Sequence, residues 1–161
     1  MIGIRKATPA DHDQIWNIIK QVIAGGDTYV FSPDSSKEKM LTYWCGQDKH
    51  TYDATVNSEV VGTFVIKDNP PDLGSHVANA SYMTWPAATG QGVGRAMGEF
   101  SLVEAKQLGY KAMQFNIVVA NNHTAVRLWE KLGFKIIGEI TEAFNHKQFG
   151  LTNAFIMYRK L

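Results

Sequence analysis

A glycine-rich turn in the second half of the chain is the feature that most constrains the fold. It reads TGQGVGR over residues 89–95 and lies between a strand-like segment, His76 to Trp85, and a stretch with helical periodicity. Glycine adopts positive φ angles without steric cost and lets another group approach the backbone closely. The first N–H groups of a helix lack internal partners, so such a turn can bind a phosphate. We therefore expect a strand–loop–helix unit with a candidate anion site, and a tight turn without a ligand is the alternative.

The rest of the chain predicts a mixed sheet flanked by helices. Thr8 is a suitable N-cap with Pro9 at the first helical position, and apolar residues then recur at helical spacing until Gly25-Gly26. Asn121 or Asn122 is a similar N-cap late in the chain. The apolar stripe expected on the helix after the glycine turn is Val93, Met97, Phe100, Val103 and Leu108. We expect strands at 2–7, 76–85, 113–119, 134–140 and 154–161, a hairpin within 51–67, a second helix ending near 44, and a loop at 143–150.

This element order is β, two helices, three strands, helix, strand, helix and two strands, which is not a regular βαβ alternation. It predicts an α/β (α+β) fold. With 161 residues, the chain has the length of about one typical domain, so we expect a single domain over residues 1–161.

Composition excludes several protein classes. The net charge of +1 argues against a dedicated nucleic-acid binder. The longest apolar run, Ala154 to Tyr158, is far too short to span a membrane. Cys45 is the only cysteine and no Cys/His spacing resembles a zinc site, so we expect no disulfide and no metal. The N-terminus lacks the apolar stretch of a signal peptide, which predicts a cytoplasmic protein that binds neither nucleic acid nor membrane.

The glycine turn can be interpreted as one of three types of phosphate-binding loop. A P-loop requires a Gly-Lys pair, and the chain contains none. A Rossmann loop requires a third glycine where Met97 stands, and an acidic residue about 20 positions further on. Residues 110–123 contain neither Asp nor Glu, which disfavours a dinucleotide. A loop that binds coenzyme A is the third interpretation.

Two segments resemble the cofactor motifs of the GNAT superfamily of acyl-CoA N-acyltransferases. The first is Thr84-Trp85-Pro86 followed by the glycine turn and its helix, and the second runs from Asn122 through Ala125 to Gly133-Phe134. The predicted element order is similar to that of the family over nearly the whole chain. The resemblance implies a mixed, mostly antiparallel sheet, flanked by about four helices and splayed open between strands ending near Trp85 and Val119. Acetyl-CoA would lie in the splay.

The resemblance also implies where acetyl-CoA binds. N–H groups of the glycine turn would hold the pyrophosphate, and backbone groups of Met83 to Trp85 would pair with the pantetheine arm and polarise the thioester carbonyl. Asn122 and Trp129 would contact the cosubstrate from the other side. The implied contacts are Met83, Thr84, Trp85, Gly90, Gln91, Gly92, Val93, Gly94, Arg95, Asn122 and Trp129.

The chain departs from the family pattern at two positions. Thr89 stands where the loop usually opens with Arg or Gln, and we expect a changed affinity because backbone N–H groups provide most phosphate contacts. Trp129 stands where many members carry a Tyr that protonates the departing thiolate, and an indole N–H cannot release a proton near neutral pH. A thiol with a pKa of about 8.5 can leave without that help. Trp129 as a simple core residue is the alternative.

The candidate catalytic residues are Tyr82 and Asn122, and the general base is not identified because no carboxylate lies on the strand from His76. Tyr82 as a core aromatic residue is the alternative. Four residues fall in loops that cover the acceptor pocket in this fold and are candidate substrate contacts, although solvated loop residues are the alternative for each. They are Asp27, Tyr29, Glu142 and His146.

These observations predict an acetyl-CoA-dependent N-acetyltransferase that acts on a primary amine of a small molecule by direct attack on the thioester. Amino acids, their analogues, polyamines and aminoglycosides all stay open as acceptors. The alternative from another class is a non-catalytic acyl-CoA-binding module, motivated by Trp129 and by the missing strand carboxylate. Homodimers are common in the family, so a homodimer is also compatible with the sequence.

Overall fold

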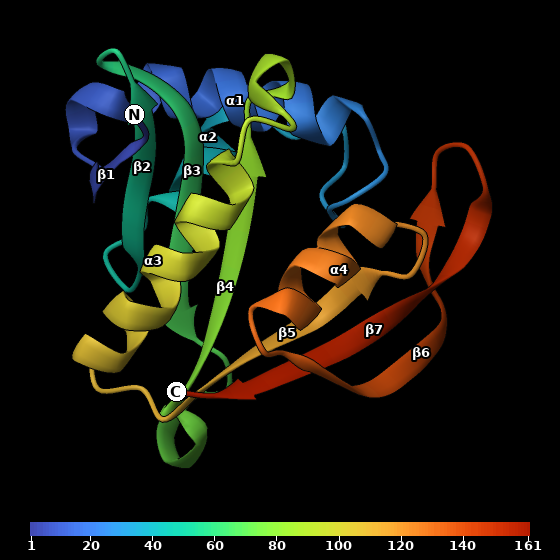
Figure 1. The fold of residues 1–161 in the computed structure, drawn as a ribbon. Helices are drawn as coiled ribbons and strands as arrows, with labels where there is room; N and C mark the ends of the chain where they lie inside the picture. Colours follow the sequence, from blue (N-terminus) through green and yellow to red (C-terminus); the bar gives the residue numbers. More distant parts are fainter.

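A computed structural model describes all 161 residues and shows a seven-stranded sheet flanked by four helices (Figure 1). The strands are β1 (Gly3–Lys6), β2 (His50–Val56), β3 (Glu59–Asp68), β4 (Val77–Thr84), β5 (Ala112–Val119), β6 (Lys135–His146) and β7 (Gly150–Lys160). The helices are α1 (His12–Ala24), α2 (Lys37–Trp44), α3 (Val93–Gln107) and α4 (His123–Lys131). The strand order is β1-β2-β3-β4-β5-β7-β6, and every pair is antiparallel except β4 with β5. The predicted mixed, mostly antiparallel fold is confirmed.

The sheet is splayed open in its middle. The parallel strands β4 and β5 pair only at their first residues, Val77 with Ala112 and Ala78 with Met113. Beyond this point the two strands diverge as a V, with α4 packed beside the open part (Figure 1). A parallel ladder that stops after two pairs leaves backbone N–H and carbonyl groups on the two facing edges without sheet partners, although each strand stays paired along its other edge.

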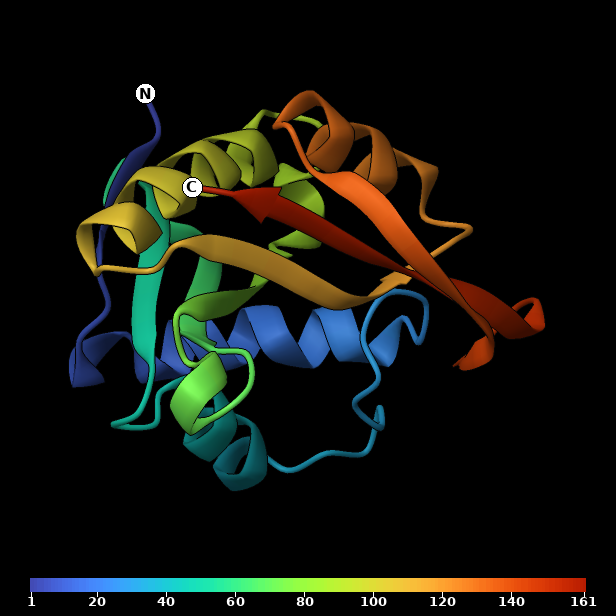
Figure 2. The same cartoon turned by 90° about the horizontal axis from the view of Figure 1, so that it is seen from below.

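Helices cover both faces of the sheet and bury two apolar clusters. α1 and α2 lie on one face, and α3 and α4 lie on the other (Figure 2). The face under α1 buries Ile15, Ile18 and Trp44 completely, and the opposite face buries Phe64 and Met97 completely. The apolar stripe predicted for α1 therefore points into the core, as its helical spacing requires.

Two sequence-based expectations about these elements are wrong. On α3, the predicted stripe ends early, because Val103 is 59% exposed while Ser101 and Ala105 are fully buried. The small side chains of Ser101 and Ala105 allow α3 to pack closely against the sheet. A search for large apolar residues at helical spacing does not find such positions. The expected loop at 143–150 is largely strand, since Phe144 pairs with Thr152. A register shift between Ile140 and Phe144 breaks the alternation along β6 that sequence reading depends on.

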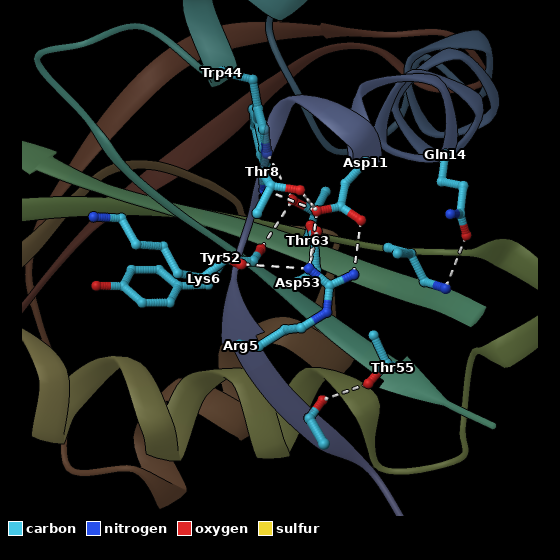
Figure 3. Close-up of polar contacts among 12 residues, drawn as sticks. Arg5, Lys6, Thr8, Asp11, Gln14, Trp44, Tyr52, Asp53, Thr55 and Thr63 are labelled. Atoms are coloured by element: carbon cyan, nitrogen blue, oxygen red, sulfur yellow. Dashed lines mark hydrogen bonds and ion pairs between the residues drawn. The ribbon is translucent and has the colours of Figure 1, made fainter. Parts of the chain in front are cut away.

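A polar cluster with two buried carboxylates, Asp11 and Asp53, joins β1, β2 and the start of α1 (Figure 3). Arg5 binds both carboxylate oxygens of Asp11, at 2.8 and 2.7 Å, and the Thr8 N–H and hydroxyl also donate to Asp11. Asp53 is completely buried beside them, 3.8 Å from the Arg5 guanidinium, and neither of its oxygens has a hydrogen-bond partner. Burial, with the nearby charge of Asp11, raises the pKa of Asp53 to about 7.

None of the four helices has the length and apolar composition needed to cross a bilayer. The cytoplasmic location stays a prediction.

Candidate functional site

The backbone N–H and carbonyl groups of two residues on the open edge of β4 face the splay. In the ladder with β3, alternate residues direct their peptide groups toward the partner strand, and the Trp85 N–H donates to the Val61 carbonyl at 2.8 Å. Met83 shares that orientation, so Tyr82 and Thr84 direct their peptide groups into the splay. The expectation that Met83, Thr84 and Trp85 all present backbone groups there is corrected, because antiparallel alternation leaves only Thr84 of the three available.

The hydroxyl of Tyr29 reaches this edge from the segment between α1 and α2. It accepts a hydrogen bond from the Tyr82 N–H at 2.8 Å and donates to the Tyr82 carbonyl. Burial raises the pKa of the Tyr29 phenol, so the group stays protonated near neutral pH. Tyr29 therefore satisfies both backbone polar groups of Tyr82 at the open edge and connects its loop to β4.

The glycine turn that follows β4 has the features of an anion site. Gly90 and Gly92 have φ angles of +82° and +84°, which side chains other than glycine rarely adopt, and the space beside both is open. No side chain caps the start of α3, and no backbone carbonyl accepts from the N–H groups of Val93, Gly94 or Arg95. Several adjacent N–H groups therefore point out of the chain without partners, which suits the oxygens of a phosphate.

A cavity of about 740 Å³ lies between the glycine turn and α4, and it is called the basic cavity here. Three of its lining residues carry positive charge and none carries negative charge. The cations are Arg95, Arg127 and Lys131. Arg95 pairs with Glu99 at 2.8 Å, whereas Arg127 and Lys131 make no ion pair within the chain. Because a polyanion gains attraction from such unpaired cations, the residues present fit the phosphates of coenzyme A.

A second cavity, of about 730 Å³, is lined by the segment after α1 and is called the loop cavity here. It includes Asp27 and Tyr29 from that segment and Ile117 to Val119 from β5. The two cavities adjoin at the splay, where they share lining residues from β4, the turn after it and α4. The shared residues are Tyr82, Thr84, Thr89, Asn122, Thr124, Ala125 and Trp129. A ligand bound in one cavity can therefore meet a ligand bound in the other.

The sequence matches the model of the Acetyltransferase (GNAT) family over residues 16–134. The chain belongs to the GNAT family of acetyltransferases. A GCN5-related N-acetyltransferase from Kribbella flavida is similar in sequence and fold, with 36% identity and a TM-score of 0.94 over 99% of this chain and 98% of that chain. The structure titled yncA, a putative acetyltransferase from Salmonella typhimurium with its cofactor acetyl-CoA, shares the fold, at 20% identity and a TM-score of 0.88 over 100% and 94% of the two chains.

A fission yeast relative, the N-acetyltransferase aca1 of Schizosaccharomyces pombe, is 35% identical over 100 residues. The match covers 62% of this chain and 48% of the yeast protein, so it spans about half the length of that relative. The membership of the GNAT family that the two motifs predict is thus confirmed.

In this member of the GNAT family the two candidate catalytic side chains have structural partners. The Tyr82 hydroxyl hydrogen-bonds to the Ser101 hydroxyl at 2.7 Å, on the α3 side of the sheet, and burial raises the pKa of its phenol. The Asn122 side chain caps α4 by accepting from the Ala125 N–H at 3.2 Å. Trp129 is 9% exposed and lies 4.8 Å from the Tyr82 ring, centroid to centroid. These contacts support a core role for the Tyr82 hydroxyl. The groups of Tyr82 that face the splay are its backbone N–H and carbonyl.

Two predicted substrate contacts of this family member lie outside both cavities. Glu142 is exposed on β6, with a φ angle of +51° and its N–H bonded to the Asn153 side chain at 3.0 Å. His146 is buried on the same strand, and its Nδ1 accepts from the N–H groups of Gln148 and Phe149. Neither Glu142 nor His146 lines a cavity, although the tip of the β6–β7 hairpin lies beside the segment after α1, where the Lys147 N–H donates to the Gly26 carbonyl at 3.0 Å.

Sequence reasoning also missed residues that line the loop cavity, among them Tyr43 on α2, Lys67 on β3, and Asn79 and Asn116 on β4 and β5. Three of these residues lie inside strands, and sequence reasoning looked for acceptor contacts in loops. The alternation of β4 did place Asn79 on the face shared with Met83. A comparison of that face with the neighbouring strand could have drawn attention to Lys67.

Proposed function

We propose that the chain is an acetyl-CoA-dependent N-acetyltransferase that transfers an acetyl group to a primary amine of a small molecule. The observation that carries this proposal is the pair of adjoining cavities. One combines unpartnered helix N–H groups with three cations and no anion, and the other opens on the opposite side of the same splayed sheet. The donor and the acceptor would enter from different sides and meet between β4 and β5.

The proposal assigns roles to the backbone first. The N–H groups of Val93, Gly94 and Arg95 would hold the pyrophosphate of acetyl-CoA. The backbone N–H and carbonyl of Thr84 would pair with the pantetheine arm, as an added strand pairs with a sheet edge, because the Tyr29 hydroxyl occupies those of Tyr82. The donor supplies the acetyl group as a thioester, whose carbonyl is attacked directly by the amine.

The acceptor amine must lose a proton to become a nucleophile, and this chain offers one carboxylate for that proton. Asp27 is the only acidic residue that lines the loop cavity, and its exposure gives it contact with water. On the donor side, Trp129 cannot protonate the thiolate, so the thiolate would leave unassisted and take its proton from water. The proton of the amine would therefore pass to Asp27, and the thiolate would take its proton from solvent. A homodimer stays a prediction.

The test measures coenzyme A binding and acetyl transfer in matched variants. Gly92→Glu places a negative side chain in the proposed phosphate site, and Gly109→Glu makes the same change at another open glycine with positive φ at the end of α3. We expect Gly92→Glu to weaken coenzyme A binding by roughly 100-fold or more in calorimetric titration, because it replaces charge-assisted hydrogen bonds by repulsion. Gly109→Glu, which carries the same backbone strain, should bind normally.

Acetyl transfer is read by mass spectrometry with acetyl-CoA and a panel of small amines. A protein-dependent acetylated amine that disappears with Gly92→Glu is the expected result. Equal coenzyme A affinity in both glycine variants would refute the assigned cosubstrate site. Tight binding without any acetylated product would instead support the non-catalytic acyl-CoA-binding module.

A further inference from the structure

The loop cavity is lined by two charged side chains of opposite sign. Asp27 comes from the segment after α1, and Lys67 comes from the end of β3. The other lining residues are neutral, and amide and hydroxyl groups such as those of Asn79, Ser81 and Asn116 supply most of the polarity. A cavity with one anion and one cation is complementary to a ligand that carries both charges.

Lys67 forms no ion pair within the chain. Its ammonium donates to the Tyr43 hydroxyl at 2.9 Å and lies 4.8 Å from the centre of the Tyr43 ring, and no carboxylate lies within 4.0 Å of it. The side chain is half-buried, so the ammonium has lost part of its contact with water. A lysine that is partly desolvated and unpaired at a cavity wall can gain a strong hydrogen bond from an anionic ligand group.

Lys49 provides an internal comparison. Its ammonium lies 4.9 Å from the centre of the same Tyr43 ring, but it pairs with Asp48 at 3.3 Å and does not line the loop cavity. Packing on Tyr43 therefore accounts for neither the missing counter-ion of Lys67 nor its place at the cavity. Both features distinguish Lys67 from a lysine that only stabilises α2.

The position of Lys67 relative to the splay gives the direction in which a ligand would lie. In the β3–β4 ladder Phe64 pairs with Tyr82 and Lys67 pairs with Asn79, so Lys67 is three residues along the strand from the level of Tyr82. Three residues of an antiparallel strand span about 10 Å. An amine that reacts beside Tyr82 would thus place a second group of the same molecule toward Lys67.

From this arrangement, and resting on the proposed acetyl transfer, we propose that the acceptor is an amine that also carries a carboxylate, with the carboxylate bound by Lys67. Amino acids and their analogues belong to this class. Polyamines and aminoglycosides do not, because they would bring further positive charges toward Lys67 and find only Asp27 as a counter-charge. Lys67 is in this view the residue that selects the acceptor.

The first experiment compares acceptors on the unaltered protein. Each amino acid is paired with its carboxamide, in which the carboxylate becomes neutral while the amine and side chain are kept, and spermidine represents the polycations. Rates are expressed per neutral amine, because the carboxamide changes the pKa of the amine. We expect kcat/KM for the carboxylate form to exceed that for the carboxamide by about 10- to 100-fold, the range of a charged hydrogen bond.

The second experiment uses Lys67→Met, with Lys49→Met as the matched control and thermal unfolding as the check on folding. Lys67→Met should raise KM for the carboxylate acceptor by about 10- to 100-fold and abolish its advantage over the carboxamide, with KM for acetyl-CoA unchanged. Lys49→Met should leave both KM values within about twofold, because the Lys49 ammonium pairs with the exposed Asp48 and lines neither cavity. Lys67→Arg, which keeps the charge, should retain the preference.

The outcomes separate this inference from the proposed function. Acetylation of amines with no preference for the carboxylate form, or an unchanged preference in Lys67→Met, would refute the role of Lys67 and leave acetyl transfer established. Should Lys67→Met unfold, the comparison of acceptors on the unaltered protein decides alone. Absence of acetylation for every amine tested would refute the proposed function, and the inference with it.

Discussion

Replacement of Asp53 by Asn should stabilise the protein at neutral and higher pH, although it removes a charge next to Arg5. The Asp53 carboxyl is completely buried and has no hydrogen-bond partner, and its pKa is raised from 3.8 to about 7. A raised pKa means that the folded protein holds the proton more tightly than the unfolded chain does. Ionisation of Asp53 therefore costs stability as the pH rises from about 4 through about 7, and the full cost applies above that window.

The magnitude follows from the same shift. A change of about three pKa units at 1.36 kcal/mol each sets a ceiling of roughly 4 kcal/mol for the cost of ionised Asp53 above pH 7. Asn removes this charge but buries an amide that also lacks partners, at a cost of about 1–3 kcal/mol. We expect a net gain of about 1–3 kcal/mol at pH 8, or a Tm higher by about 2–10 °C for a chain of this length.

The assay measures urea and thermal unfolding of both proteins at pH 5 and pH 8, with circular dichroism as the signal. Near pH 5 the wild-type Asp53 is protonated, so the advantage of Asp53→Asn should vanish or reverse. Asp11 titrates in the opposite sense, since its hydrogen bonds to Arg5 lower its pKa, but it is present in both proteins and largely cancels in the comparison. Asp48→Asn, at an exposed site, is the control and should show no such pH dependence. A difference in stability that is the same at pH 5 and pH 8 would refute the reasoning.

Two further predictions concern the tyrosines beside the splay. Tyr29→Phe removes the hydroxyl that bridges the Tyr82 N–H and carbonyl, so we expect a stability loss of about 1–3 kcal/mol in urea unfolding and faster proteolysis of the segment after α1. An unchanged cleavage rate would show that other contacts hold this segment. Tyr82→Phe should keep kcat within about threefold, because the lost hydroxyl bonds to Ser101 on the α3 side, whereas a loss of about 100-fold would identify a catalytic hydroxyl.

Several parts of the fold and the site could be predicted because they depend on residues close together in the chain. Thr8 and Pro9 begin the first helical segment, Asn122 caps α4, and Gly92 takes the positive φ angle that its place before α3 requires. The same local logic indicated the glycine turn as a candidate anion site. It could not show which peptide units of β4 are free, because that depends on the pairing of β4 with β3.

What the sequence determined by itself, then, is the order of elements, their caps and the backbone geometry of the glycine turn, since each rests on the conformational preferences of neighbouring residues. Only the tertiary structure decided that β4 and β5 part after two pairs, that Asp27 and Lys67 line the same cavity, and that Asp53 is sealed beside Arg5 and Asp11. These features join residues that lie far apart in the chain. Their distances and burial follow from how the strands pair and how the helices cover the sheet, which no local pattern encodes.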